Sequence, residues 1–136
     1  MKKQLEHVKL FHDTFNGIVN HEPVILNEET AYLRYALLNE ENREYYEACL
    51  DNNLEEIVDA LGDQLYIVLG TIITHGCQDI IEDVFDEIQR SNMSKLGDDG
   101  KPIINGVNYT DDTRPLGKVI KGKNWSPPNI KQFLKK

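Results

Sequence analysis

Basic side chains are almost missing from the middle of this chain. Between residues 40 and 63 the sequence holds nine acidic side chains and a single basic one, Arg43. The protein's own cations therefore cannot neutralise the cluster, and carboxylates that are crowded without partners raise one another's pKa. A divalent cation from outside the chain would resolve this conflict, so the stretch is a candidate metal site.

Cysteine is scarce as well, and long hydrophobic runs are absent. Cys49 falls inside a predicted helix and Cys77 in a short connection, so we expect free thiols and no disulfide framework. The four histidines show no metal-ligand spacing with them. No uninterrupted apolar run approaches the roughly 18–20 residues that cross a bilayer, and the first residues lack the apolar region of a secretory signal. We therefore expect a cytoplasmic protein with no membrane partner.

Charge is divided unevenly along the chain. The formal net charge is −8, but residues 1–90 hold 19 acids against 6 bases, whereas residues 91–136 hold 4 acids against 9 bases. A large acidic body argues against nucleic acid as the main partner, because phosphate neutralisation needs a basic face. A small phosphorylated ligand, held by metal on one side and by lysines on the other, fits this division better.

The length and the hydrophobic pattern predict one all-α domain over residues 1–136, with a helical core of about 3–93 and a cationic tail of about 94–136. Helices are expected over 3–16, 28–50, 54–74 and 78–93, as a four-helix bundle. Asn27 reads as an N-cap, and the break at residues 51–53 is short enough to make the second and third helices antiparallel. In the tail, residues 102–104 and 118–120 either pair as a small β-hairpin or lie as loop.

Two groups of carboxylates should face each other across that helix pair. The first is a Glu-Glu-x-x-Glu cluster on the second helix, and the second has the spacing i, i+3, i+7 on the third; their members are Glu40, Glu41 and Glu44, and Glu56, Asp59 and Asp63. Mg²⁺ prefers such oxygen ligands. The alternative is a solvated acidic face, the common meaning of a charge run. Asp59 and Asp63 weigh against it, since both are embedded in apolar sequence.

The chain resembles the MazG-like all-α nucleoside triphosphate pyrophosphohydrolases, in a phage and bacterial branch. That superfamily pairs Glu-Glu-x-x-Glu with a later Glu-x-x-Asp. Four further ordered segments carry the resemblance over nearly the whole chain, namely residues 59–66, 91–96, 99–103 and 121–128. One departure is Ala60, which stands where a register set by Asp63 expects Glu. If Asp59 sets the register instead, Glu56 satisfies the motif and Asp63 is an additional acid.

The resemblance implies Mg²⁺-dependent cleavage of a (deoxy)nucleoside triphosphate to the monophosphate and pyrophosphate, as nucleotide-pool house-cleaning, with Mn²⁺ as a substitute metal. It implies metal ligands among Glu41, Glu44, Glu56, Asp59 and Asp63, and Glu40 or Glu44 as the general base. It further implies substrate contacts from tail residues that can reach phosphate, sugar or base: Asn92, Lys95, Lys121 and Asn124.

Related proteins assemble their helices into multi-chain bundles, so the resemblance also implies a homodimer or homotetramer. Two alternatives stay open. One is a non-catalytic helical interaction module, in which the acids are surface and the cationic tail binds a partner. The other keeps the site but hydrolyses another phosphorylated nucleotide, such as an alarmone or a phosphoribosyl adenylate. A panel of nucleotides with and without Mg²⁺ separates all of these.

Overall fold

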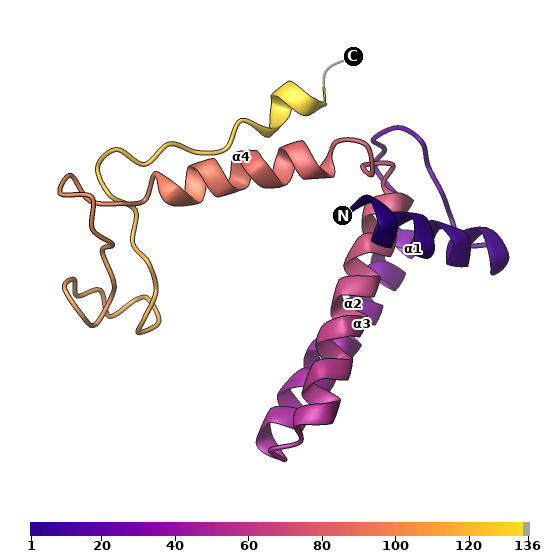
Figure 1. The fold of residues 1–136 in the computed structure, drawn as a ribbon, viewed down its shortest axis with the longest axis horizontal. Helices are drawn as coiled ribbons and strands as arrows, with labels where there is room; N and C mark the ends of the chain where they lie inside the picture. Colours follow the sequence, from indigo (N-terminus) through magenta and orange to yellow (C-terminus); the bar gives the residue numbers. More distant parts are fainter. Residues whose placement is uncertain (135–136) are drawn as a thin grey trace. The chain divides into compact units, whose positions relative to one another are not determined.

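The structure is a computed structural model that describes residues 1–134 (Figure 1). Its elements in chain order are α1 (Lys2–Thr14), α2 (Glu28–Leu50), α3 (Leu54–Thr74), α4 (Ile81–Met93) and a single-turn 3-10 helix, η1 (Ile130–Phe133). Strand pairing in the described residues is limited to two isolated bridges. The all-α fold class is confirmed, and the predicted helices are found, although the last begins three residues later than expected.

The chain divides into two compact units. The first covers residues 1–81 and contains α1, α2 and α3, and the second covers residues 82–136 and contains α4 with the tail. The organisation as one domain over the whole chain stays a prediction. The acidic helices belong to the first unit, and the cationic tail belongs to the second.

Helices α2 and α3 form an antiparallel hairpin because both have strong N-caps and a tight turn joins them (Figure 1). The side-chain oxygen of Asn27 accepts a hydrogen bond from the Thr30 amide at 2.8 Å, and that of Asn53 accepts one from the Glu56 amide at 3.3 Å. Such caps satisfy amides that would otherwise be unpaired. Asn52 takes a left-handed conformation, with φ of 53°, which asparagine tolerates better than most residues. The hairpin places acidic residues of α2 and α3 at the same level along its long axis.

Helix α1 packs across one end of this hairpin and forms the small hydrophobic core of the first unit. Leu5 and Val8 of α1 are buried against Leu69 and Ile73 of α3. Full burial of such side chains stabilises a fold by about 1.5–3 kcal/mol each. The core therefore fixes α1 on α3 and leaves the rest of the hairpin outside it.

A half-buried arginine ties α2 to α3 close to that core. Arg34 donates hydrogen bonds from Nε to Thr71 Oγ1 at 3.0 Å and from Nη2 to the Ile67 carbonyl at 2.7 Å. Burial lowers the pKa of this guanidinium from its ordinary value. Glycine at position 70 makes room for both side chains, because a Cβ there would lie 2.7 Å from Arg34 Nη2 and 2.9 Å from His12 Nε2, and these side chains would have to shift. The three helices of the first unit therefore meet at Gly70.

Helix α3 is buried on one side only, although the sequence of its C-terminal half is apolar on nearly every side. Leu69 and Ile73 are buried, but Leu61, Leu65 and Val68 are 49%, 54% and 39% exposed. The reason is geometric, because α1 and α2 together cover a single side of the helix. The apolar pattern that suggested a central helix instead gives this hairpin an apolar outer face.

The same helix qualifies by length and composition as a membrane span, which revises the expectation that no segment would. Within the described residues, α3 has a window of 18 residues with a mean hydropathy of 1.4, of which 28% is buried. The core helix of a soluble protein meets the same criteria, so this is weak evidence for a membrane. Asp59 and Asp63 interrupt the apolar sequence.

In the second unit the tail returns along α4 and is fastened to it by polar contacts. Ser91 donates from Oγ to the Ser126 carbonyl at 2.9 Å, and Arg90 donates from Nη1 to Ser126 Oγ at 2.6 Å. Glu87 accepts from Arg90 at 2.8 Å and from the Asn129 amide at 2.8 Å. These donors lower the pKa of Glu87 to about 2. The position of the C-terminal segment on α4 is thus set by ionic and hydroxyl contacts.

The predicted small hairpin in the tail is present in minimal form. Ile104 and Val119 form a single antiparallel bridge, and the Ile120 amide donates to the Ile103 carbonyl at 2.8 Å. Asn105, which is 2% exposed, holds the intervening loop by donating from Nδ2 to several of its carbonyls. The two apolar stretches therefore pair, but too briefly to form strands.

Candidate functional site

Carboxylates from two helices gather midway along the α2–α3 hairpin. Glu40, Glu41 and Glu44 come from α2, and Asp59 and Asp63 come from α3. Within each helix the spacing keeps the acids near one side, and the antiparallel pairing brings the two sides together. Across the helices, the Gln64 amide donates from Nε2 to the Glu41 carbonyl at 3.4 Å. Asp59 and Asp63 of α3 therefore lie close enough to act electrostatically on Glu41 of α2, while the assignment of these acids as a metal site stays a prediction.

Glu41 lies at the centre of this group. Its Oε2 atom is excluded from solvent and has no hydrogen-bond partner. Burial is the largest cause of the rise in the pKa of Glu41, followed by the negative charges of Asp63, Glu44, Glu40 and Asp59 in that order. A buried acceptor without a donor is uncommon in native proteins and calls for an explanation such as an ion. Glu41 therefore presents a desolvated carboxylate oxygen that is free to accept a ligand.

The acids of α3 also border a hollow of about 450 Å³ that lies beside this helix. Its lining includes Glu56, Asp59 and Asp63. Within the described part of the chain, Asp59 and Asp63 contribute to the raised pKa of Glu41, whereas Glu56 does not. Asp63 is the strongest of the charged neighbours. These charges favour the register in which Asp59 and Asp63 are the acids of α3 nearest to Glu41.

The carboxylates are near one another without being assembled as a coordination shell. Over residues 1–134, no three Asp, Glu, His or Cys side chains lie close enough together to hold a metal ion. Glu40, Glu44, Asp59 and Asp63 are all exposed. Like charges that can reach water separate from one another unless a cation draws them in. The donor set still suits a hard cation, because every member offers oxygen, and Glu41 offers an oxygen that is already desolvated.

The four polar residues predicted to bind substrate gather at the C-terminal end of α4. Lys95 donates from Nζ to Asn92 Oδ1 at 2.7 Å, and the Lys95 carbonyl accepts from the Gly122 amide at 2.9 Å. That bond brings the segment with Lys121 and Asn124 beside the segment with Asn92 and Lys95. All four therefore belong to one surface of the second unit.

Two partners in this cluster were not expected from the sequence. Lys121 Nζ lies 3.4 Å from the centroid of the Trp125 ring, a cation–π contact that holds the ammonium over the ring face. Asn124 donates from Nδ2 to Asp98 Oδ1 at 2.9 Å. The sequence shows that Lys121 and Trp125 are four residues apart, but this spacing alone does not tell whether the Trp125 ring contacts the lysine or packs in a hydrophobic core.

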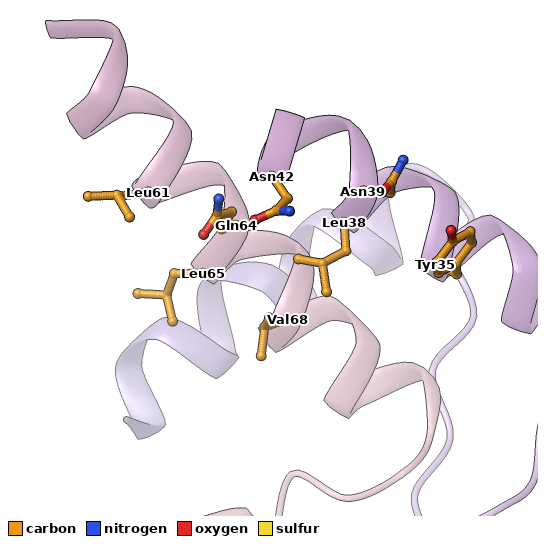
Figure 2. Close-up of a pocket in the computed structure, with 8 residues that line it drawn as sticks. All are labelled: Tyr35, Leu38, Asn39, Asn42, Leu61, Gln64, Leu65 and Val68. Carbon is orange, nitrogen blue, oxygen red and sulfur yellow. The ribbon is translucent and has the colours of Figure 1, made fainter. Parts of the chain in front are cut away.

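An apolar groove of about 580 Å³ lies along the α2–α3 hairpin (Figure 2). One aromatic, four aliphatic and three amide side chains from the two helices line it, namely Tyr35, Leu38, Asn39, Asn42, Leu61, Gln64, Leu65 and Val68. Leu61 and Leu65 follow Asp59 and Asp63 by two positions, which is about 200° around a helix. The groove and the carboxylates therefore occupy nearly opposite sides of α3.

Comparison with known proteins gives a family match and two similar proteins. Residues 8–92 match the phosphoribosyl-ATP pyrophosphohydrolase family. An uncharacterized protein of Acanthamoeba polyphaga mimivirus is 44% identical over 55 residues, which are 40% of this chain and 22% of that protein, so the chain spans about a fifth of its length. A crystal structure of a "putative NTP pyrophosphohydrolase" from Exiguobacterium sp. 255-15 is 24% identical, with a TM-score of 0.46, over 96% of this chain and 90% of that one.

Proposed function

Because the chain belongs to the phosphoribosyl-ATP pyrophosphohydrolase family, as the match over residues 8–92 shows, we propose that it hydrolyses a nucleoside triphosphate between the α- and β-phosphates. The products are the nucleoside monophosphate and pyrophosphate, and the cofactor is Mg²⁺, with Mn²⁺ as a substitute. The observation that carries the proposal is Glu41, whose buried oxygen lacks a partner amid four other carboxylates. Membership of a pyrophosphohydrolase family supports the interpretation of these carboxylates as a site for phosphate hydrolysis.

Glu41, Glu44, Asp59 and Asp63 are the residues that would hold the metal, with Glu56 as a further ligand. The fit rests on their oxygen donors and on the desolvated Glu41 Oε2. When bound, Mg²⁺ supplies charge neutralisation of the phosphate oxygens and a bound water of lowered pKa. Neutralisation would also remove the repulsion that raises the pKa of Glu41.

Glu40 and Glu44 are the candidates to orient the attacking water and to accept its proton. Both are exposed, and both act electrostatically on Glu41, so each carboxylate lies beside the proposed metal ligands and remains open to water. A general base must lie within hydrogen-bond reach of the proton that it takes. Glu44 is also a proposed metal ligand, and Glu40 is therefore the base if Glu44 is committed to the metal.

Asn92, Lys95, Lys121 and Asn124 are proposed to contact the nucleotide. Lysine ammonium groups suit phosphate oxygens as point charges, and asparagine side chains can both donate and accept toward a sugar or base. The contacts of Lys95 with Asn92 and of Lys121 with Trp125 support this role, because they fix flexible side chains in advance. A fixed side chain loses less conformational entropy when it binds a ligand.

A phosphoribosyl adenylate is the second candidate substrate, and the family match favours it over the alarmone alternative. Both candidates present a triphosphate chain next to a ribose, so the carboxylate site would serve either. The difference lies at the base, which carries a second phosphoribosyl group in the alternative. A substrate panel that includes ATP and phosphoribosyl-ATP distinguishes them.

We further propose that the apolar groove of the hairpin is where two copies of the chain meet, as a homodimer or within a homotetramer. Tyr35 is 63% exposed, and Leu65 is 54% exposed, on a face that the first unit leaves open. Contiguous exposed apolar surface of this kind is typical of protein interfaces. Leu65→Glu is expected to reduce the mass measured by light scattering to that of a monomer, whereas Leu10→Glu, on an equally exposed site of α1, should not.

The experiment that tests the proposed function is pyrophosphate release from each nucleotide with Mg²⁺ and with a chelator. We expect Mg²⁺-dependent turnover of at least one substrate, and its loss in Glu44→Gln with unchanged helical circular dichroism. Glu47→Gln, on the same helix and paired with Arg43 at 3.7 Å, is the matched control. No turnover of any nucleotide in Mg²⁺ would favour the non-catalytic helical module. A cytoplasmic location is likewise proposed, as the compartment of the nucleotide pool.

A further inference from the structure

Three aromatic side chains form an exposed cluster on the first unit. Phe11 and Phe15 of the α1 end have ring centroids 4.5 Å apart, and Phe11 meets Tyr66 of α3 edge to face, at 5.7 Å and 88°. Phe15 is 66% exposed, Phe11 46% and Tyr66 37%. An edge-to-face contact uses at most one face of each ring, so further stacking surface remains available. This cluster lies outside the hydrophobic core.

Tyr66 continues the stripe of α3 that carries the carboxylates. Asp59, Asp63 and Tyr66 have the spacing i, i+4, i+7, which places them on one side of a helix. Tyr66 follows Asp63 by three residues, a rise of about 4.5 Å along the axis. The aromatic cluster is therefore the next surface along the hairpin from the metal-binding acids, on the side away from the apolar groove.

A ligand bound to both surfaces would need anionic and aromatic parts separated by a short linker. A nucleotide has this construction, since one ribose ring joins its phosphates to a flat base. Acidic side chains beside the rings disfavour an acidic partner, unless a bound cation lies between the carboxylates and the phosphates of that partner. Stacking on aromatic rings is a general way to bind bases, and it tolerates every base because each has a π-face.

We propose that Phe11, Phe15 and Tyr66 form the stacking platform for the base of the nucleotide. This inference rests on the proposed function in one respect, because it takes the carboxylates to be the phosphate end of the same site. It assigns the stacking of the base, as distinct from its hydrogen bonds, to α1 and α3 of the first unit. A further consequence is weak discrimination among bases, since the platform offers ring faces and a single hydroxyl, that of Tyr66.

The test is binding of nucleoside monophosphates and of ribose 5-phosphate in Mg²⁺, by isothermal titration calorimetry on the full chain. These probes share a phosphate and a ribose and differ in the base. We expect the monophosphate to bind more tightly, and Tyr66→Leu to weaken it by about 5- to 150-fold while ribose 5-phosphate is unchanged. Tyr66→Phe, which keeps the ring, should retain the wild-type affinity.

Two further variants guard against misreading. Phe15→Ala removes the most exposed ring beyond the end of α1 and should weaken the monophosphate alone, and Leu10→Ala, at an exposed site of α1, should change neither affinity. Equal affinities of the two probes for the wild-type protein, or equal weakening of both by Tyr66→Leu, would overturn the platform. So would a change in oligomeric mass with unchanged binding, which would make the rings a subunit contact. The two proposals can fail separately. Absence of triphosphate turnover would contradict the proposed function alone, because calorimetry measures binding to the aromatic cluster whether or not the protein hydrolyses a triphosphate.

Discussion

Glu41→Gln is expected to make the metal-free protein more stable and to remove its response to Mg²⁺. The substitution keeps the size of the side chain and deletes the charge that four neighbouring carboxylates oppose. Exposed charge pairs are worth about 0.2–1 kcal/mol each, and water screens all four neighbours, so their relief should raise the free energy of unfolding by only about 1 kcal/mol in total. For a chain of this length that corresponds to a rise in Tm of about 3–5 °C.

The pH dependence has a defined sign. The pKa of Glu41 is higher in the folded protein than in the unfolded chain, so between these two values the folded state binds more protons. The free energy of unfolding of the metal-free protein therefore decreases as the pH rises through that window and stays lower above it. In Glu41→Gln this contribution to the slope should be absent.

Mg²⁺ should reverse the order of the two proteins. At a hundredfold excess over Kd, a ligand that binds only the folded state stabilises it by about 2.7 kcal/mol. The wild type should show this gain and the Gln variant should not. The assay is urea unfolding followed by circular dichroism, with Mg²⁺ or with chelator, at several pH values, and Glu47→Gln serves as the control. A variant that is less stable than wild type without metal, or that keeps the full Mg²⁺ response, would refute the role of Glu41.

Two other predictions concern the second unit. Lys121→Ala should raise KM about tenfold with little change in kcat, because a contact to bound phosphate stabilises the ground state and the transition state alike. Lys123→Ala is the neighbouring control. An unaltered KM in Lys121→Ala would place Lys121 outside the site. The Asn129 amide donates a hydrogen bond to Glu87, whose pKa is lowered to about 2. This amide should lose hydrogen-exchange protection as the pH falls from about 4.3, the ordinary pKa of glutamate, toward about 2. A protection factor that stays constant over this range would show that the hydrogen bond to Glu87 does not hold the amide.

The helices and the acidic pairing were predictable because their causes are local. Asn27 and Asn53 are caps that act on amides within the next turn, and the spacing of Asp59 and Asp63 fixes their side of the helix. The structure adds what depends on contacts distant in sequence. Phe11 and Tyr66 are 55 positions apart, and the hydrophobic periodicity of the two helices does not predict that their rings are in contact.

Burial was the less predictable property. The sequence of α3 is apolar on nearly every side, but a pattern cannot tell a neighbour within the chain from a neighbour in a second copy. Leu61 and Leu65 are consequently exposed in the single chain. The central place of Glu41 likewise needed the structure, because three adjacent glutamates differ only in direction, and it is Glu41 whose oxygen turns away from water.

The central claim is that the Glu41 carboxylate group supports hydrolysis of a nucleotide between its α- and β-phosphates. It is tested most directly by ³¹P nuclear magnetic resonance of the products formed from the active nucleotide in Mg²⁺. We predict equal amounts of nucleoside monophosphate and pyrophosphate from the wild type and neither from Glu41→Gln. Release of inorganic phosphate and a diphosphate, or an undiminished rate in Glu41→Gln, would contradict the account.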